Sequence, residues 1–151
     1  MMASATASLT SSYIWGRLAD RSSRRVLIYA AALAALTNAT AAVLALAMPE
    51  KLAFAPILPL LLFVLTVAYQ GVRLGRSVHI IDMADLDNRA TYTALSNSIV
   101  GVILLAGGIF GFIARWFGLG AVLAIFALMA ALAIPTAAQL REVQAVDADQ
   151  S

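Results

Sequence analysis

In YIWGRLADRSSRRVLIYAAAL, residues 13–33, four arginines and one aspartate stand directly before a long stretch without charge. Four such stretches contain no Asp, Glu, Lys, Arg or His: Val26–Met48, Leu52–Val72, Thr91–Ala114 and Phe117–Leu140. A helix needs roughly 20 apolar residues to cross the hydrocarbon core, and an ionised residue at mid-bilayer costs at least ~2.5–3.5 kcal/mol. The pattern therefore predicts four transmembrane helices.

The composition supports the same interpretation. The 151 residues are 62% hydrophobic and only 12% charged, more apolar surface than a soluble domain of this length can bury. In lipid, isolated strands leave backbone groups unsatisfied, so we expect an all-α, multi-pass membrane helical bundle. The basic residues sit at the ends of apolar segments and not in one stripe, which argues against a nucleic-acid partner.

Lysines and arginines are distributed unevenly on the two sides of the predicted spans. One side holds eight: Arg17, Arg21, Arg24, Arg25, Arg73, Arg76, Arg89 and Arg141. The other side holds only Lys51 and Arg115. The positive-inside rule then predicts a cell (inner) membrane protein with both termini and the middle loop in the cytoplasm.

The predicted spans divide the chain into three parts. Residues 1–25 form a cytoplasmic segment in which 3–15 is the stub of an earlier helix, 26–140 form the four-helix transmembrane region, and 141–151 form a cytoplasmic polar tail. The Ser-, Thr- and Ala-rich start with its arginines also resembles a mitochondrial transit peptide, an alternative that we consider weaker.

One motif, GRLADRSSRRVLI at residues 16–28, resembles the cytoplasmic loop signature of the major facilitator superfamily, G-x-L-A-D-R-x-G-R-[KR]-x-x-[LI]. Eight positions match: Gly16, Leu18, Ala19, Asp20, Arg21, Arg24, Arg25 and Ile28. Ser23 departs from the pattern, which has glycine there. If that position requires a positive φ, serine costs on the order of 1 kcal/mol.

The resemblance implies a motif that gates the cytoplasmic face. Its expected members are Gly16, Leu18, Asp20, Arg21, Arg24, Arg25 and Arg89. Gly16 would let a neighbouring helix approach closely, and Asp20 would accept hydrogen bonds from Arg21 or Arg24. The alternative is a solvated basic loop without a gating role.

Residues 73–114 also resemble the family's loop between its tenth and eleventh helices, with Arg89 at the arginine that ends the loop. The four spans then resemble helices nine to twelve of a twelve-helix transporter. By this resemblance the chain has a partial major facilitator fold and is a carboxy-terminal fragment, with the amino-terminal half as the less favoured register. Alone, it is expected not to transport.

The same resemblance places the second and third spans beside a central cavity. The candidate cavity-lining residues are Thr66, Tyr69, Gln70, Ser96 and Asn97, whose side chains donate and accept hydrogen bonds. The alternative role for each is a bond between helices. Gly107 and Gly111 form a G-x-x-x-G pair that predicts close packing of the third span against another backbone.

Few catalytic chemistries remain open. The chain has no cysteine, which excludes disulfides and thiolate sites. Asp82, Asp85 and Asp87 with His79 lack a second ligand cluster, so we expect no metal, no cofactor and no enzyme.

Two functions remain. One is part of a secondary transporter, a permease for a small-molecule solute, which works with a missing amino-terminal part. The other is a non-transporting membrane subunit that binds an oligomer partner.

Overall fold

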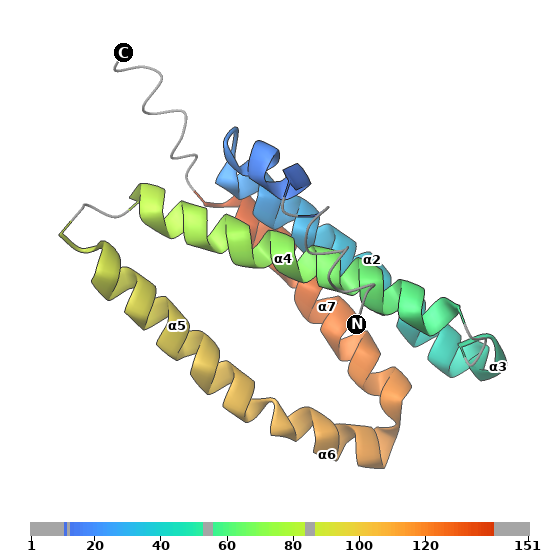
Figure 1. Cartoon of the computed structure of the whole chain (residues 1–151). Coiled ribbons are helices and arrows are strands. Elements are labelled where there is room, and N and C mark those ends of the chain that lie inside the picture. Colours follow the sequence, from blue (N-terminus) through green and yellow to red (C-terminus); the bar gives the residue numbers. More distant parts are fainter. Residues whose placement is uncertain (1–10, 12, 53–55, 84–86, 141–151) are drawn as a thin grey trace.

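A computed structural model of the chain describes residues 11, 13–52, 56–83 and 87–140, and all regular structure within them is helical. The helices are a short one at 13–19, α2 (Ser23–Ala47), α3 (Pro49–Leu52), α4 (Ile57–Met83), α5 (Arg89–Ala106), α6 (Gly108–Phe117) and α7 (Leu119–Ala138) (Figure 1). The predicted tail 141–151, most of the predicted stub 3–15, and Asp85 lie outside the described residues.

Four helical stretches are long and apolar enough to cross a membrane: α2, α4, α5 together with α6, and α7. This confirms the predicted all-α fold with four spans, and such helices indicate a multi-pass protein in a lipid bilayer. The first span ends at Ala47, because Pro49 disfavours helical geometry in the residue before it.

The second span differs from its predicted bounds. It begins at Ile57, since Leu52 closes the short α3, and it continues to Met83 instead of ending at Val72. Its 27 residues extend over about 40 Å, whereas the hydrocarbon core is about 30 Å thick. The prediction of a loop from residue 73 is therefore wrong for its first eleven residues, because a helix can continue beyond the hydrocarbon core of the bilayer.

The third span is broken between α5 and α6. The Gly107 N–H bonds to the Leu104 carbonyl at 3.0 Å and the Phe110 N–H bonds to the Gly107 carbonyl at 3.0 Å, so the chain tightens locally from four-residue to three-residue spacing. Figure 1 shows α6 turning away from the line of α5. The adjacent Gly107 and Gly108 supply no side chains to hold the helix straight.

The core lies where α2 packs between α4 and α7, which run alongside it (Figure 1). Trp15, Ala19, Val26 and Ala30 form a buried cluster at the start of α2. Buried Asn38 stays within its own helix, since its side chain donates to the Ala34 carbonyl at 2.9 Å. Small residues on α2 let the neighbouring helices come close.

Neighbouring helices approach each other closely at glycines, but not at the glycine pair that we predicted. A Cβ built on Gly71 would lie 2.7 Å from Trp15 Cε2 and 2.8 Å from Ala30 Cβ, and one on Gly75 would lie 3.1 Å from Val26 Cγ1. At Gly111 nothing lies within 4 Å, and Gly107 meets only the carbonyls and backbone of its own helix turn. Within the described residues, the predicted Gly107–Gly111 contact therefore has no partner helix.

Candidate functional site

The motif residues form a turn that joins helix 13–19 to α2. Asp20 and Arg21 make the turn, and the Ser22 side chain accepts a hydrogen bond from the Arg25 backbone N–H at 3.1 Å. Serine is a favoured helix cap because its oxygen satisfies an N–H that has no partner in the helix. α2 accordingly begins at Ser23, earlier than the predicted Val26.

The backbone at Ser23 does not require the glycine that the signature has at this position. Among the described residues only glycine has a positive φ, so the position has no need of a left-handed conformation and the strain cost that we considered is absent. Both Ser23 and His79 of α4 are buried, and the Ser23 hydroxyl lies 3.2 Å from His79 Nδ1 in a hydrogen bond. The serine therefore links the motif to the second span.

Two further contacts connect this region to other helices. Arg24 Nη1 donates to the Leu140 carbonyl just beyond α7 at 3.4 Å, and Trp15 Nε1 donates to the Val67 carbonyl of α4 at 2.9 Å. The contacts cross 116 and 52 positions of sequence, respectively. We call residues 16–25, with His79 and Leu140, the motif junction, because it joins the ends of α2, α4 and α7.

The other predicted gating residues have less contact. Gly16 has nothing within 4 Å of a built Cβ, so no neighbouring helix approaches it. Leu18 packs against the buried cluster, whereas Asp20, Arg21 and Arg25 are exposed. In the part of the chain that the structure describes, Asp20 accepts no hydrogen bond from Arg21 or Arg24, contrary to the prediction. Arg89 is the first residue of α5.

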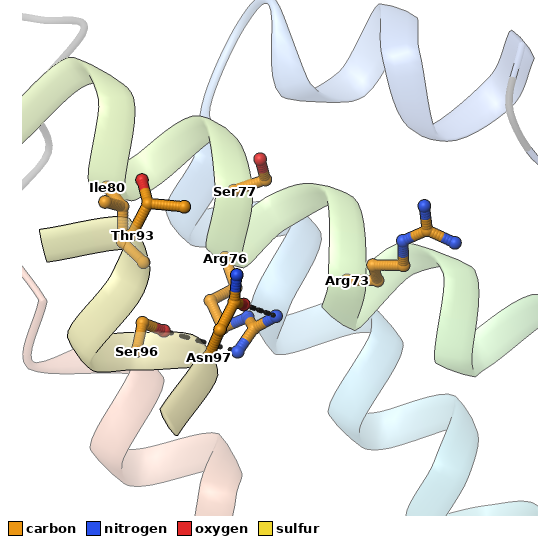
Figure 2. Close-up of a pocket in the computed structure, with 7 residues that line it drawn as sticks. All are labelled: Arg73, Arg76, Ser77, Ile80, Thr93, Ser96 and Asn97. Atoms are coloured by element: carbon orange, nitrogen blue, oxygen red, sulfur yellow. Dashed lines mark hydrogen bonds between the residues drawn. The ribbon is translucent and has the colours of Figure 1, made fainter. Parts of the chain in front are cut away.

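A second polar region lies between α4 and α5. It is a pocket of about 210 Å³ lined by Arg73, Arg76, Ser77, Ile80, Thr93, Ser96 and Asn97 (Figure 2). The α4 residues lie at i, i+3, i+4 and i+7, and the α5 residues at i, i+3 and i+4, so each set occupies one helix face. We call this the arginine pocket.

Arg76 is the residue that spans the arginine pocket. Its Nη1 donates to Ser96 Oγ at 3.2 Å and its Nη2 donates to Asn97 Oδ1 at 3.4 Å. Figure 2 shows the Arg76 guanidinium directed toward both side chains and Arg73 further along α4. Both acceptors are neutral, so the positive charge of Arg76 is held in place without being neutralised.

The five predicted cavity residues do not share one cavity. Ser96 and Asn97 lie in the arginine pocket, but Thr66 and Tyr69 line a mainly apolar groove of about 420 Å³ between α2 and α4. Thr66 Oγ1 also donates to the Leu62 carbonyl of its own helix at 2.7 Å. Gln70 is half-buried on α4 and lies outside both pockets.

Sequence reasoning missed the arginine side of this pocket. Arg73 and Arg76 were assigned to a loop, where their spacing carries no meaning. Extending the second helix to Met83 turns the same residues into a polar stripe with Ser77, and the matching stripe of Thr93, Ser96 and Asn97 was present in the predicted third span. The two patterns together were the available signal.

No metal centre is formed by the part of the chain that the structure describes, where no three His, Asp or Glu side chains come together. His79, the one histidine of the chain, uses its Nδ1 toward Ser23.

Comparison with models of protein families, with curated proteins and with solved structures finds no match to this chain.

Proposed function

We propose that the chain is part of a secondary active transporter of the major facilitator type, which moves a small solute across the cell membrane by alternating access. The observation that carries the proposal is the motif junction. Ser23, where the signature has glycine, contacts His79 of α4, and Arg24, which matches the signature, contacts the chain just beyond α7, so the start of α2 ties three spans together.

The strength of these contacts suits a reversible gate. An intramolecular hydrogen bond contributes about 1 kcal/mol net, so two or three of them contribute a few kcal/mol. Two states that differ by a few kcal/mol are both accessible, and a bound solute shifts their populations by its differential affinity. When the Ser23–His79 and Arg24–Leu140 contacts break, the ends of α4 and α7 are free to separate from α2.

In this proposal both termini and the motif junction face the cytoplasm. The arginines of the junction and of the arginine pocket lie toward this face, whereas Lys51 and Arg115 lie toward the other. Alternating access needs an opposing helical bundle, so a further transporter part completes the carrier and the 151-residue chain alone is inactive.

A reversible cross-link tests the gate. Because the chain has no cysteine, the double variant Ser23→Cys/His79→Cys places its only two thiols at the junction. Membrane vesicles that contain the chain with its complementing part are assayed for uptake of a labelled metabolite panel. We expect oxidation to abolish uptake and reduction to restore it, while the single-thiol control Ser98→Cys stays active under the same oxidation.

Two results would refute the proposal. Full cross-linking without any effect on uptake would remove the gating role of the junction. Saturable uptake by liposomes that hold the 151-residue chain alone would show that no further part is needed.

A second candidate is a non-transporting membrane subunit that associates with another helical membrane protein. It is favoured by α5 and α6, in which no residue is buried and in which Leu105 is 85% exposed. Such a subunit forms a stable, defined oligomer in detergent and shows no flux with any complementing part.

A further inference from the structure

We propose that the arginine pocket binds one anionic, oxygen-rich group of the phosphate or carboxylate type. The pocket brings Arg73 and Arg76 to one face of α4, opposite hydroxyl and amide side chains of α5. Among the described residues neither guanidinium forms an ion pair with a carboxylate, so the site carries positive charge and contains no anion of its own.

Arg76 is oriented for such a ligand. A guanidinium has five N–H donors, and the bonds to Ser96 and Asn97 use one on each terminal nitrogen. The donors that remain are fixed in position by those two bonds, which lowers the conformational entropy lost on binding. Arginine pairs with phosphate or carboxylate oxygens through two parallel hydrogen bonds, a geometry that lysine does not offer.

The rest of the pocket complements this arginine. Arg73 supplies a second positive charge one helical turn away, and the Ser77 and Thr93 hydroxyls are further donors on the two facing helices. The volume of about 210 Å³ is below the roughly 300–1,000 Å³ of pockets for drug-sized ligands. The size therefore fits a single anionic group and not a larger organic molecule.

The position along α4 leaves two sources of the anion. Arg73 and Arg76 follow the uncharged part of the helix, where a span leaves the hydrocarbon and phospholipid headgroups begin. Basic pockets between helices at this depth bind anionic headgroups, and a free anion reaches the same donors from water. The inference does not rest on transport, because binding is measured without flux.

Three variants of the purified full chain distinguish anion binding at this pocket from non-specific attraction of anions to the basic surface. Arg76→Gln removes the charge that spans the pocket. Asn97→Asp keeps Arg76 but puts a carboxylate where Oδ1 now lies 3.4 Å from Nη2, so it competes with the ligand from inside the pocket. Arg17→Gln is the matched control, since Arg17 is exposed on helix 13–19 and, among the described residues, donates to the Tyr13 hydroxyl at 3.4 Å.

Two probes identify the source. Inorganic phosphate is titrated at constant ionic strength while the arginine Nε–H signals are followed by NMR. Nanodiscs of phosphatidylglycerol are compared with nanodiscs of phosphatidylcholine, and the lipid retained by the protein is counted by native mass spectrometry. Saturable phosphate binding identifies a free anion as sufficient, whereas selective retention of phosphatidylglycerol without phosphate binding identifies a lipid headgroup.

We expect Arg76→Gln and Asn97→Asp each to weaken binding at least about tenfold, and Arg17→Gln to change it less than about twofold. If Arg76→Gln does not fold, Asn97→Asp decides alone, because its new ion pair replaces the hydrogen bond between α4 and α5. The proposal is overturned if neither probe binds saturably, if Asn97→Asp binds as wild type does, or if Arg17→Gln loses as much affinity as the pocket variants.

Discussion

The three helices α2, α4 and α7 and the broken span α5–α6 are similarly apolar, yet they are packed very differently. α2 alone buries eight of its residues, among them Val26 and Ala30, whereas α5 and α6 bury none. In lipid the hydrophobic effect does not drive helices together, so association depends on close packing and hydrogen bonds. Hydropathy thus predicts which segments cross the membrane but not which of their faces meet.

The two G-x-x-x-G pairs make this difference concrete. Gly71 and Gly75 face the Trp15, Val26 and Ala30 side chains at short distance, whereas Gly111 faces open space. The spacing is the same in both pairs. What differs is the neighbour: α2 offers small side chains over most of its length, whereas α6 contacts α7 through other positions, such as Phe110 against Phe126, and not through Gly111.

The largest expected effect comes from adding one methyl group to the packed pair. Gly71→Ala places a Cβ within 2.8 Å of two side-chain atoms, so Trp15 or α2 must shift. We expect a loss of about 3 kcal/mol in the free energy of unfolding, measured by circular dichroism in mixed micelles.

Gly111→Ala is the matched control. It meets no atom within 4 Å and gains helix propensity, so we expect no loss and a gain of up to about 1 kcal/mol. Equal losses in the two variants would show that the packed and unpacked regions do not differ as described.

A smaller effect is expected at the motif junction. Ser23→Ala leaves buried His79 Nδ1 without its hydroxyl partner, which costs about 2 kcal/mol in the free energy of unfolding. Ser98→Ala, on the exposed surface of α5, is expected to change stability by less than about 0.5 kcal/mol. Ser23→Gly, which introduces the glycine of the signature that the motif resembles, should be no more stable than Ser23→Ala; a stabilised glycine variant would contradict the helical role of this position.

The smallest effect concerns the two tryptophans. Trp15 is 7% exposed and donates to the Val67 carbonyl, whereas Trp116 on α6 is 71% exposed. Trp15→Phe is expected to lower the free energy of unfolding by about 1 kcal/mol. Trp116→Phe serves as the control, and we expect it to leave unfolding in micelles unchanged. A larger loss for Trp116→Phe would indicate that the Trp116 side chain has a packing partner in the membrane.

The sequence predicted the number and type of the spans well, because the absence of charge over some twenty residues has a direct physical cause in the bilayer. It did not predict that α4 continues through Arg73 and Arg76, since hydropathy reports the lipid thickness and not the length of a helix. It also did not predict the Gly107 break, which depends on local backbone bonding.

The candidate site was predicted in part for a related reason. Ser96 and Asn97 were recognised as polar residues inside a span, but the arginine that holds them was assigned to a loop. Thr66 and Tyr69 were grouped with them because all are polar, although they lie in a different groove. Which face of a helix a residue occupies relative to other helices is a tertiary property that one sequence does not reveal.

The bond between Arg24 and the Leu140 carbonyl joins residues 116 positions apart. At a synthesis rate of roughly 5–20 residues per second, the ribosome makes the second partner on the order of ten seconds after the first. The rest of α2, α4 and the broken span are made during that interval, before α7 can occupy its place against α2. Packing of α2, α4 and α7 is therefore completed only when α7, the last of these three helices, has been translated, and the broken span between α4 and α7 does not enter this packing.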